Sequence, residues 1–365
     1  MSRAPSLVPL FMLPYLTAFL PGCTLAIEPS QYGNGTNEPP PALLLGGERA
    51  SSSPRSTAET FTVKVGPSGQ PLGWVPQLAL PRAGDWVSHA SQTGIAAFSL
   101  SPDSNLEAFS AWDGTSLRPW MVKVGPALPD LAAATLVLTD AAMFVLGNAS
   151  SPEGRMDRVA FSLRKGDSFG EFAIAPQTLV TGRFRPMVIQ CRGHMLVLGG
   201  EGNHLGDPSP VEHFDIAKLS PQRDSLGAFQ KGPALTFESR PHRVSGAAVV
   251  CTQGFVFVIG GRSPTYNETT DIVISASFSS DGIAGPWKTQ GRLPAPSRDA
   301  VAFAAGNRLI LAGGRSGANS PATTKVLSTA IAPDGTLGPW NAEPKAALPD
   351  GLLRASVVRL GAADD

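Results

Sequence analysis

A short apolar run that ends in a pair of small, turn-forming residues recurs along the chain and restricts the folds that it can adopt. The run occurs five times, as LLLGG (43–47), MFVLGN (143–148), MLVLGG (195–200), FVFVIGG (255–261) and LILAGG (309–314). Such a run is long enough for a strand that is covered on both faces but too short for a helix. The glycine pair that follows allows the backbone to turn where a Cβ atom would clash.

A second phrase, a tight turn followed by an aromatic residue, alternates with the first. Its closing aromatic residues are Trp74, Trp120, Phe172, Phe229, Trp287 and Trp340. These positions are separated by 46, 52, 57, 58 and 53 residues. A period of roughly 50 residues with four strand-like segments in each unit indicates a single domain of repeated sheets, because each unit must bury its faces on its neighbours.

In these repeats, and in turns such as DGIAGPW (281–287) and DGTLGPW (334–340), the chain resembles the kelch-repeat β-propeller family. The turns resemble those of large bacterial envelope proteins with kelch repeats. The resemblance covers residues 42 to 365 and implies a six-bladed, all-β propeller. It also implies a binding platform more often than an enzyme, so it specifies the architecture better than the activity.

The repeat predicts five complete blades, which we number 1 to 5. They span about 80–120, 128–172, 179–229, 235–287 and 293–340. Blade 1 has no glycine pair near 95–100. Within each blade we expect the outermost strand to end at the aromatic residue, as 336–340 would in blade 5, and that residue to fill the gap between blades.

A sixth blade, the closing blade, is divided between the two ends of the chain. Residues 42–76 contain three strand-like segments with no first strand before them, and RASVVRL (354–360) resembles a first strand with nothing after it. The two fragments are complementary. We therefore expect the segment 350–365 to supply the first strand to 42–76 and to close the ring.

The composition indicates no strongly charged partner. Lysine plus arginine equals aspartate plus glutamate, at 29 each. This balance gives no electrostatic reason to expect nucleic acid or an anionic membrane surface as a partner. With 39 glycines and 34 prolines, the chain suits many short strands joined by turns.

The N-terminal segment predicts export. Arg3 precedes an apolar stretch of 14 residues at 7–20, too short to span a bilayer, and Leu20, Gly22 and Cys23 resemble a bacterial lipobox. We expect a signal peptide over 1–22, a lipid on Cys23 and a flexible tether over 23–41. An ordinary cleaved signal peptide is the alternative. Thr24 follows the cysteine, which favours the outer membrane or cell surface.

Two further cysteines, Cys191 and Cys251, lie about one repeat apart. In an oxidising envelope they could form a disulfide between adjacent blades. The alternative is two buried thiols that act as small hydrophobic side chains.

Propeller topology places the connections between blades, and those between the second and third strands, on one face. The longer and more varied of these predicted loops make this the expected binding face. Arginines gather just before the predicted inner strands on it: Arg82, Arg183, Arg185, Arg240, Arg243, Arg298 and Arg354. They could hold a carboxylate or sulfate, or they could have a structural role and donate to backbone carbonyls of neighbouring blades, as is common in kelch-like repeats. Loop residues Glu201, His204 and Tyr266 are further candidates for ligand contacts.

The sequence gives little support for metal or cofactor chemistry, and we expect neither. Tyr15, Tyr32 and Tyr266 are the three tyrosines, and the first two precede the propeller, which excludes the copper-radical chemistry of galactose-oxidase-like propellers. The five histidines are scattered, and none has the spacing of a helical zinc site. Six-bladed kelch propellers do include periplasmic sialate mutarotases, which handle an acidic sugar with arginine and acid side chains. By analogy of fold, Glu201 or Asp299 beside the arginines could serve as the acid of such an enzyme.

We therefore expect a monomeric, membrane-anchored scaffold of the bacterial envelope that recognises a protein or glycan through its long-loop face. Its membrane contact would be through the lipid alone. The alternative is an enzyme that acts on an acidic sugar, an isomerase or mutarotase-like enzyme or a lyase, at an arginine-lined mouth.

Overall fold

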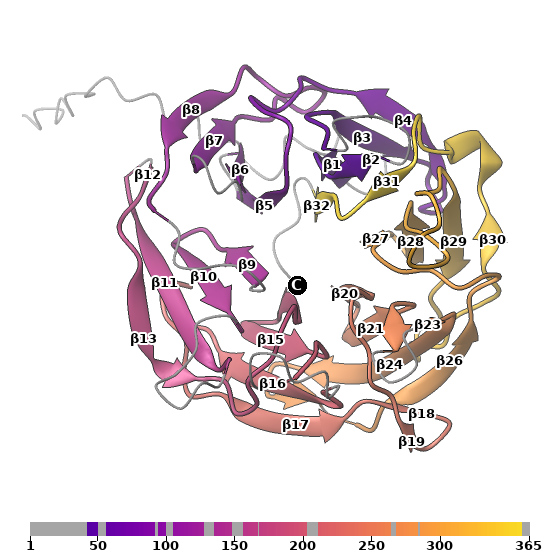
Figure 1. Ribbon diagram of the computed structural model, residues 1–365. Coiled ribbons are helices and arrows are strands. Elements are labelled where there is room, and N and C mark those ends of the chain that lie inside the picture. The colour runs from indigo at the N-terminus through magenta and orange to yellow at the C-terminus, as the bar shows by residue number, and fades with distance from the viewer. Residues whose placement is uncertain are drawn as a thin grey trace, which may run out of the picture.

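The fold was determined as a computed structural model that describes residues 42–49, 56–91, 94–99, 105–127, 135–147, 156–166, 168–202, 211–263, 268–283 and 285–359. Its main strands form six sheets arranged in a ring around a central axis (Figure 1). The chain is a six-bladed β-propeller, which confirms the predicted fold. No helix within the described ranges is long and apolar enough to cross a bilayer.

Each blade places its first strand nearest the axis and its last strand outermost. The closing blade contains β32 (Ser356–Arg359), β1 (Ala42–Leu45), β3 (Thr60–Val65) and β4 (Pro71–Pro76). Blade 1 contains β5 (Trp86–Ser91), β6 (Gly94–Ser99), β7 (Leu106–Ser110) and β8 (Met121–Val124). Blade 2 contains β9 (Thr135–Leu138), β10 (Ala142–Leu146), β11 (Arg158–Lys165), β12 (Ser168–Phe169) and β13 (Ala173–Thr178).

The other three blades follow the same plan. Blade 3 contains β14 (Met187–Cys191), β15 (His194–Leu198), β16 (His213–Lys218) and β17 (Gln230–Ala234). Blade 4 contains β20 (Ala248–Thr252), β21 (Phe255–Ile259), β24 (Ile272–Ser279), β25 (Gly282–Ile283) and β26 (Lys288–Arg292). Blade 5 contains β27 (Val301–Ala305), β28 (Arg308–Ala312), β29 (Val326–Ala330) and β30 (Asn341–Ala342).

Three two-stranded ladders and one short helical turn complete the described structure. The ladders pair β2 (Glu48–Arg49) with β31 (Leu352–Leu353), β18 (Thr236–Phe237) with β19 (Arg240–Pro241), and β22 (Arg262–Ser263) with β23 (Glu268–Thr269). The turn is a 3-10 helix at Pro344–Ala346.

The ring closes as predicted. β32, from the C-terminal end of the chain, pairs antiparallel with β1, with Leu43 opposite Val358 and Leu45 opposite Ser356. Blade 1 forms although it lacks a glycine pair. Its second strand, β6, is buried along its whole length and pairs with β5 and β7.

The expected position of the outermost strand is wrong in blade 5. The segment 336–340 contributes only an isolated bridge between Ile331 and Leu337, and the outer strand β30 begins after Trp340. The physical reason lies in the residue before the aromatic. Pro339 has no backbone N–H to donate to a ladder, so pairing resumes only beyond it.

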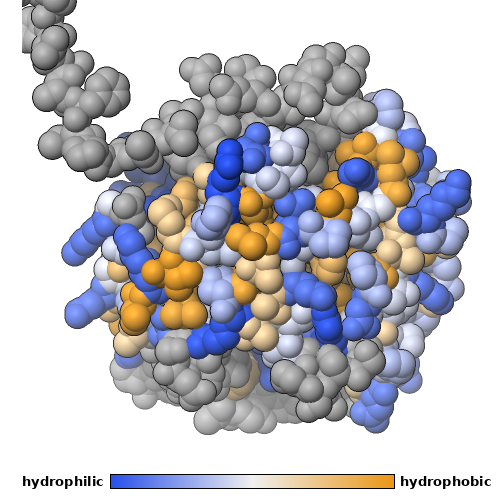
Figure 2. Space-filling view, turned by 90° about the horizontal axis from the view of Figure 1, so that it is seen from above, coloured by the Kyte–Doolittle hydropathy of each residue, from blue (hydrophilic) through white to orange (hydrophobic). Residues whose placement is uncertain are grey.

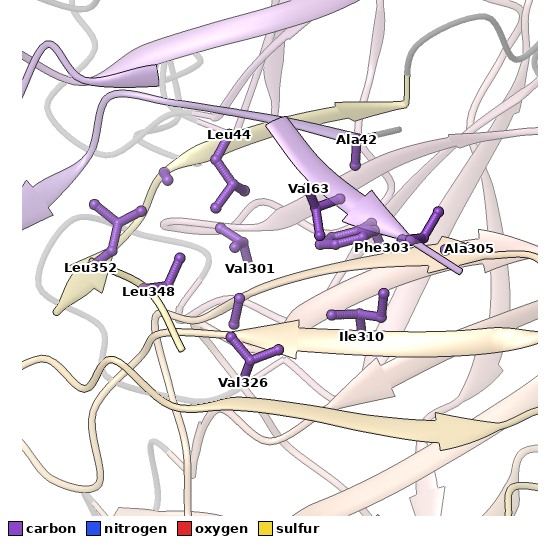
Figure 3. Close-up of a cluster of buried hydrophobic side chains, with 13 residues drawn as sticks. Ala42, Leu44, Val63, Val301, Phe303, Ala305, Ile310, Val326, Leu348 and Leu352 are labelled. Carbon is purple, nitrogen blue, oxygen red and sulfur yellow. The ribbon is translucent and has the colours of Figure 1, made fainter. Parts of the chain in front are cut away.

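The core is divided among the junctions between blades. Six clusters of buried hydrophobic side chains lie among the described residues, one at each junction. Figure 3 shows the cluster in which Leu44 and Val63 of the closing blade meet Val301, Phe303 and Ile310 of blade 5. Because each sheet is covered on both faces, its strands are apolar without strict alternation.

The repeated aromatic residues pack at these junctions, as predicted. The ring of Trp74 meets that of Phe303 edge to face at a centroid distance of 6.3 Å, and its Nε1–H donates to the carbonyl of Ala346 at 2.7 Å. Trp287 makes the same kind of contact with Phe214, at 6.1 Å. The aromatic side chains therefore fill the space between blades as it widens away from the axis.

Outer strands of neighbouring blades expose apolar side chains. Leu72 of β4 is 54% exposed and Met121 and Val124 of β8 are 60% and 83% exposed. The side of the ring seen in Figure 2 mixes such hydrophobic groups with hydrophilic ones. With four residues, β8 is a short strand, which limits edge-to-edge pairing.

A disulfide joins two adjacent inner strands. Cys191 ends β14 in blade 3 and Cys251 lies in β20 of blade 4, with their Cα atoms 5.7 Å apart. The sequence left open a disulfide or two buried thiols, and the structure has the disulfide. The bond connects segments 60 residues apart, so it limits the freedom of the unfolded chain.

His242 is a buried group whose charge depends on pH. It follows β19, contacts the ring of Phe237 and is 7% exposed. Burial lowers the pKa of His242 to about 4. The imidazole is therefore neutral in the folded protein at neutral pH, whereas an unfolded histidine takes up a proton near pH 6.5.

We expect this histidine to make the fold sensitive to acid. As pH falls below 6.5 the unfolded state binds the extra proton, so stability decreases until the pH reaches the folded pKa. His242 should account for about 2 kcal/mol of the loss between pH 7 and pH 5. Urea unfolding of wild type and His242→Gln at pH 7 and pH 5 measures this loss of unfolding free energy. Equal losses in the two proteins would contradict the role of His242.

Candidate functional site

A cavity of about 550 Å³ lies where the segments that precede the inner strands meet the ends of the second strands. This is the face that the sequence predicted for binding. Charged, polar and apolar residues from every blade form its wall: Asp85, Thr135, Leu136, Arg185, Pro186, Met187, Glu201, Ser245, Gly246, Ala247, Arg262, Arg298, Asp299, Ala300, Val301, Arg315, Arg354 and Ala355. The cavity is within the usual size range of small-molecule sites.

The glycine pairs hold the blades together at this end of the axis. The N–H of Gly261 donates to the carbonyl of Ser297 at 2.7 Å, and the N–H of Gly314 donates to that of Leu352 at 2.9 Å. The second glycine of each of these pairs thus bonds to the segment that enters the next blade. The backbone around the cavity is therefore fixed by hydrogen bonds between blades.

A left-handed residue stands two positions before the inner strand in four blades. Arg185, Gly246, Asp299 and Arg354 have φ values of 47°, 60°, 57° and 51°. Their backbones are connected in part, because Asp299 N–H donates to Gly246 O and Arg354 N–H donates to Asp299 O, both at 2.9 Å. This conformation is unfavourable for residues other than glycine and is concentrated at functional sites.

A charged residue also follows each of the four Gly-Gly pairs of the repeat directly. These residues are Glu48, Glu201, Arg262 and Arg315. Of these, the sequence prediction included only Glu201, although a charged residue immediately after each glycine pair was a signal available in the repeat. Arg262 and Arg315 lie in the cavity wall, and Glu48 bonds to Arg354 of that wall.

Asp299 is the centre of the ion pairs in this wall. Arg315 holds its Oδ2 through Nε at 2.9 Å and Nη2 at 2.7 Å. The Nε atoms of Arg298 and Arg354 lie farther away, 3.6 Å from Oδ2 and 3.7 Å from Oδ1 respectively. One carboxylate thus faces three guanidinium groups but forms hydrogen bonds with only one of them.

Arg298 is the most crowded cation in the wall. Its side chain is 11% exposed, and its Nε has no hydrogen-bond acceptor within the part of the chain that the structure describes. Burial and then the charge of Arg315 lower its pKa. Arg262 and Arg354 lower it further, and only Asp299 opposes them. The environment therefore disfavours the charge that this guanidinium carries.

Glu201 and Asp85 supply negative charge elsewhere in the wall. Glu201 pairs with Arg262 and accepts a hydrogen bond from Ser245 Oγ at 2.9 Å. Asp85 reaches solvent, but its partial enclosure and the charge of Glu48 raise its pKa. An acid beside the arginines is the feature that we associated with the enzyme alternative, and a raised pKa is typical of acids at functional sites.

The structure brings together four of the predicted residues: Arg185, Glu201, Arg298 and Arg354 all line the cavity. It places four other predicted arginines outside the wall. His204, Tyr266 and Cys23 lie outside the described residues.

Arg183 is fully buried and has a structural role, but it bonds to carbonyls of its own blade and not to those of a neighbouring blade as the sequence alternative expected. Its Nη1 donates to the carbonyls of Val197, Gly199 and His213 at 3.0 to 3.2 Å, and Nη2 pairs with Asp215 at 2.8 Å. These bonds fasten the strands of blade 3, so Arg183 is not presented to the cavity.

The expectation that all seven arginines gather at the mouth is therefore wrong. Arg82 bonds to Ser99 Oγ within blade 1, and Arg243 donates to Glu212 Oε2 at 3.1 Å on the same face as the cavity. Arg240 lies in the β18–β19 hairpin, which Figure 1 shows at the outer side of the ring. Sequence position before an inner strand does not determine which way a side chain points.

The described residues contain no group of three histidine, cysteine, aspartate or glutamate side chains placed to hold a metal ion. The charged groups of the cavity are instead arginines and carboxylates. The fold and this site define the class: a six-bladed β-propeller with a charged cavity at one end of its axis.

Comparison with known proteins supports the fold alone. No protein-family model matches the chain, and no curated protein matches it. The solved structure of YjhT is similar, with a TM-score of 0.52 and 14% sequence identity over 75% of this chain and 87% of that chain. At this identity the likeness shows a shared propeller architecture and nothing of the ligand.

Proposed function

We propose that this chain is a kelch-type propeller of the bacterial envelope that binds a protein or glycan through the face with the cavity. The observation that carries the proposal is the cavity itself, because its wall combines converging charged side chains with a backbone fixed between blades. A rigid ring that presents varied loops is well suited to recognition. We expect the protein to act as a monomer.

The proposal includes export and attachment by a lipid on Cys23, for which the N-terminal sequence is the support. The topology is compatible with this attachment. β1 runs from Ala42 toward Gly46 and Gly47, which lie at the cavity end of the blade, so Ala42 lies at the opposite end. A membrane tether that joins at Ala42 leaves the cavity open to a partner on the other face.

Crosslinking in cells followed by capture of the full chain tests this function. Wild type should recover one abundant envelope partner, and the double variant Arg185→Ala, Arg298→Ala should lose it. Arg118→Ala is the matched control, because Arg118 is 65% exposed and belongs to a turn at the other end of the blade. Recovery of the partner by the double variant at the wild-type level would contradict the proposal.

A second candidate is an isomerase, mutarotase-like enzyme or lyase that acts on an acidic sugar. Asp85 favours it, because its raised pKa suits an acid that exchanges protons while the arginines hold the substrate carboxylate. Exchange between the anomers of galacturonate, followed by NMR, tests the mutarotase form. Catalysis by wild type that Asp85→Asn abolishes would support it. Exchange at the uncatalysed rate with wild type would contradict it.

A further inference from the structure

We infer that the cavity binds a carboxylate group between Arg298 and Arg354, beside Asp299. The inference rests on the proposed binding function and names the chemical group that this site recognises. It is argued from three properties of the wall: its net charge, the hydrogen-bonding capacity of its arginines and the rigidity of the backbone that carries them.

The net charge of the wall is positive. Among the described residues, five arginines and three carboxylates line the cavity, which leaves an excess of two positive charges. Several of these groups are shielded from water, where like charges repel more strongly than in solution. Glu48, just outside the wall, pairs with Arg354 and offsets one of these charges, so among the described residues a net positive charge remains that an entering anion would offset.

The arginines differ in their remaining hydrogen-bonding capacity. Arg315 is occupied, because it binds Asp299 through two nitrogens and the carbonyl of Ala318 through Nη1 at 3.0 Å. Arg262 is paired with Glu201. Arg354 donates through Nη1 to Glu48 at 2.8 Å, while its Nε lies beyond hydrogen-bond distance of Asp299.

Among the arginines of the wall that are largely buried, Arg298 has the greatest remaining capacity. It makes only a 3.6 Å ion pair with Asp299, although its side chain is almost wholly removed from water. A buried guanidinium normally has several hydrogen-bond acceptors, because the cost of burying its charge is otherwise large. A ligand anion is the acceptor that would compensate this cost.

The chemistry of the arginines favours a carboxylate. The Nε atoms of Arg298 and Arg354 lie 3.6 Å and 3.7 Å from different oxygens of Asp299, so both guanidinium groups line the cavity next to the same carboxylate and neither is within hydrogen-bond distance of it. Planar guanidinium groups bind carboxylates through paired hydrogen bonds. The cavity volume of about 550 Å³ admits a small acid, or the acidic end of a longer chain.

The backbone holds these groups in place before a ligand arrives. Asp299 and Arg354 are both left-handed, and the N–H of Arg354 donates to the carbonyl of Asp299 at 2.9 Å. Preorganised donors lose little conformational entropy on binding. The site therefore needs no rearrangement of its backbone to receive an anion.

Isothermal titration of the full chain in detergent with malonate, at constant ionic strength, tests the inference. Malonamide is the neutral control for the ligand. We expect saturable binding of malonate and none of malonamide. Arg298→Gln should weaken malonate binding about 10- to 100-fold, because a charged hydrogen-bond partner is lost. Arg298→Lys should weaken it less, and Arg118→Gln should leave it unchanged.

Thermal unfolding of Arg298→Gln shows whether the fold is retained. We expect an equal or higher Tm, since the substitution removes a cation that its neighbours repel. With the fold intact, equal binding of malonate and malonamide would overturn the inference, as would unchanged malonate affinity in Arg298→Gln. Tighter binding of sulfate than of malonate would overturn the assignment to a carboxylate.

Further titrations show whether the carboxylate belongs to a small acid or to the end of a longer chain. The capture experiment distinguishes failure of the carboxylate inference from failure of the proposed function. Tighter binding of oligogalacturonate than of galacturonate would favour the end of a longer chain, and equal binding would favour a small acid. If the double variant Arg185→Ala, Arg298→Ala loses the partner but wild type binds malonate no better than malonamide, the proposed function stands and the carboxylate inference fails. If malonate binds through Arg298 but the variants still capture the partner, the inference stands and the proposed function fails.

Discussion

Truncation of the chain after Gly351 is expected to prevent the protein from folding to a stable, soluble state. The deletion removes β31 and β32, and with β32 the partner of β1. It also removes the buried side chains of Leu352 and Val358 from the two junctions of the closing blade, and the buried side chain of Leu353. Loss of three such side chains costs about 5 kcal/mol or more, a value comparable with the whole stability of many domains.

The matched control is truncation after Arg359. It retains β32 and all four of the residue pairs that join it to β1, so its Tm should equal that of the full chain. Soluble yield, circular dichroism and thermal unfolding of the two truncated proteins provide the measurement. A protein that ends at Gly351 and unfolds at the wild-type temperature would show that the ring does not depend on its C-terminal strand.

The repeat made the fold predictable because its signals are local. A continuous apolar run followed by two glycines specifies a covered strand and the turn after it, wherever it occurs. The complementary ends of the chain then implied ring closure. Blade 1 formed without a glycine pair because the apolar pattern of β6, buried along its whole length, is sufficient for a central strand.

The candidate site was predictable only in part, because side-chain direction depends on the local backbone conformation and on contacts that form only in the folded blade. Arg183 and Arg185 are two residues apart, yet Arg183 is buried in bonds to blade 3 and Arg185 is exposed in the cavity wall. The left-handed φ of Arg185 accompanies this difference. A positive φ at an arginine has no sequence signal, and neither has the burial that surrounds Arg298.

The second large loss of stability is expected on substitution of Gly313, a glycine that packs against the backbone of the next blade. Gly313 has a φ of 70°, and a Cβ atom there would lie 2.3 Å from the carbonyl oxygen of Leu352 in the next blade. Gly313→Ala should therefore destabilise the protein by about 3 to 5 kcal/mol, of which roughly 1 to 2 kcal/mol is backbone strain and the remainder the clash. The backbone carbonyl cannot move without displacing β31.

Gly193→Ala separates the two causes, because Gly193 has a φ of 75° but no atom within 4 Å of its added Cβ. This variant should lose only about 1 to 2 kcal/mol, the cost of the strained backbone. Urea unfolding compares the two proteins, and equal losses would contradict a role for the contact with Leu352. Because Leu352 is two residues before Arg354, Gly313→Ala should also weaken malonate binding, whereas Gly193→Ala should leave it unchanged. The same glycine would then determine both how the blades join and how the cavity holds its cations.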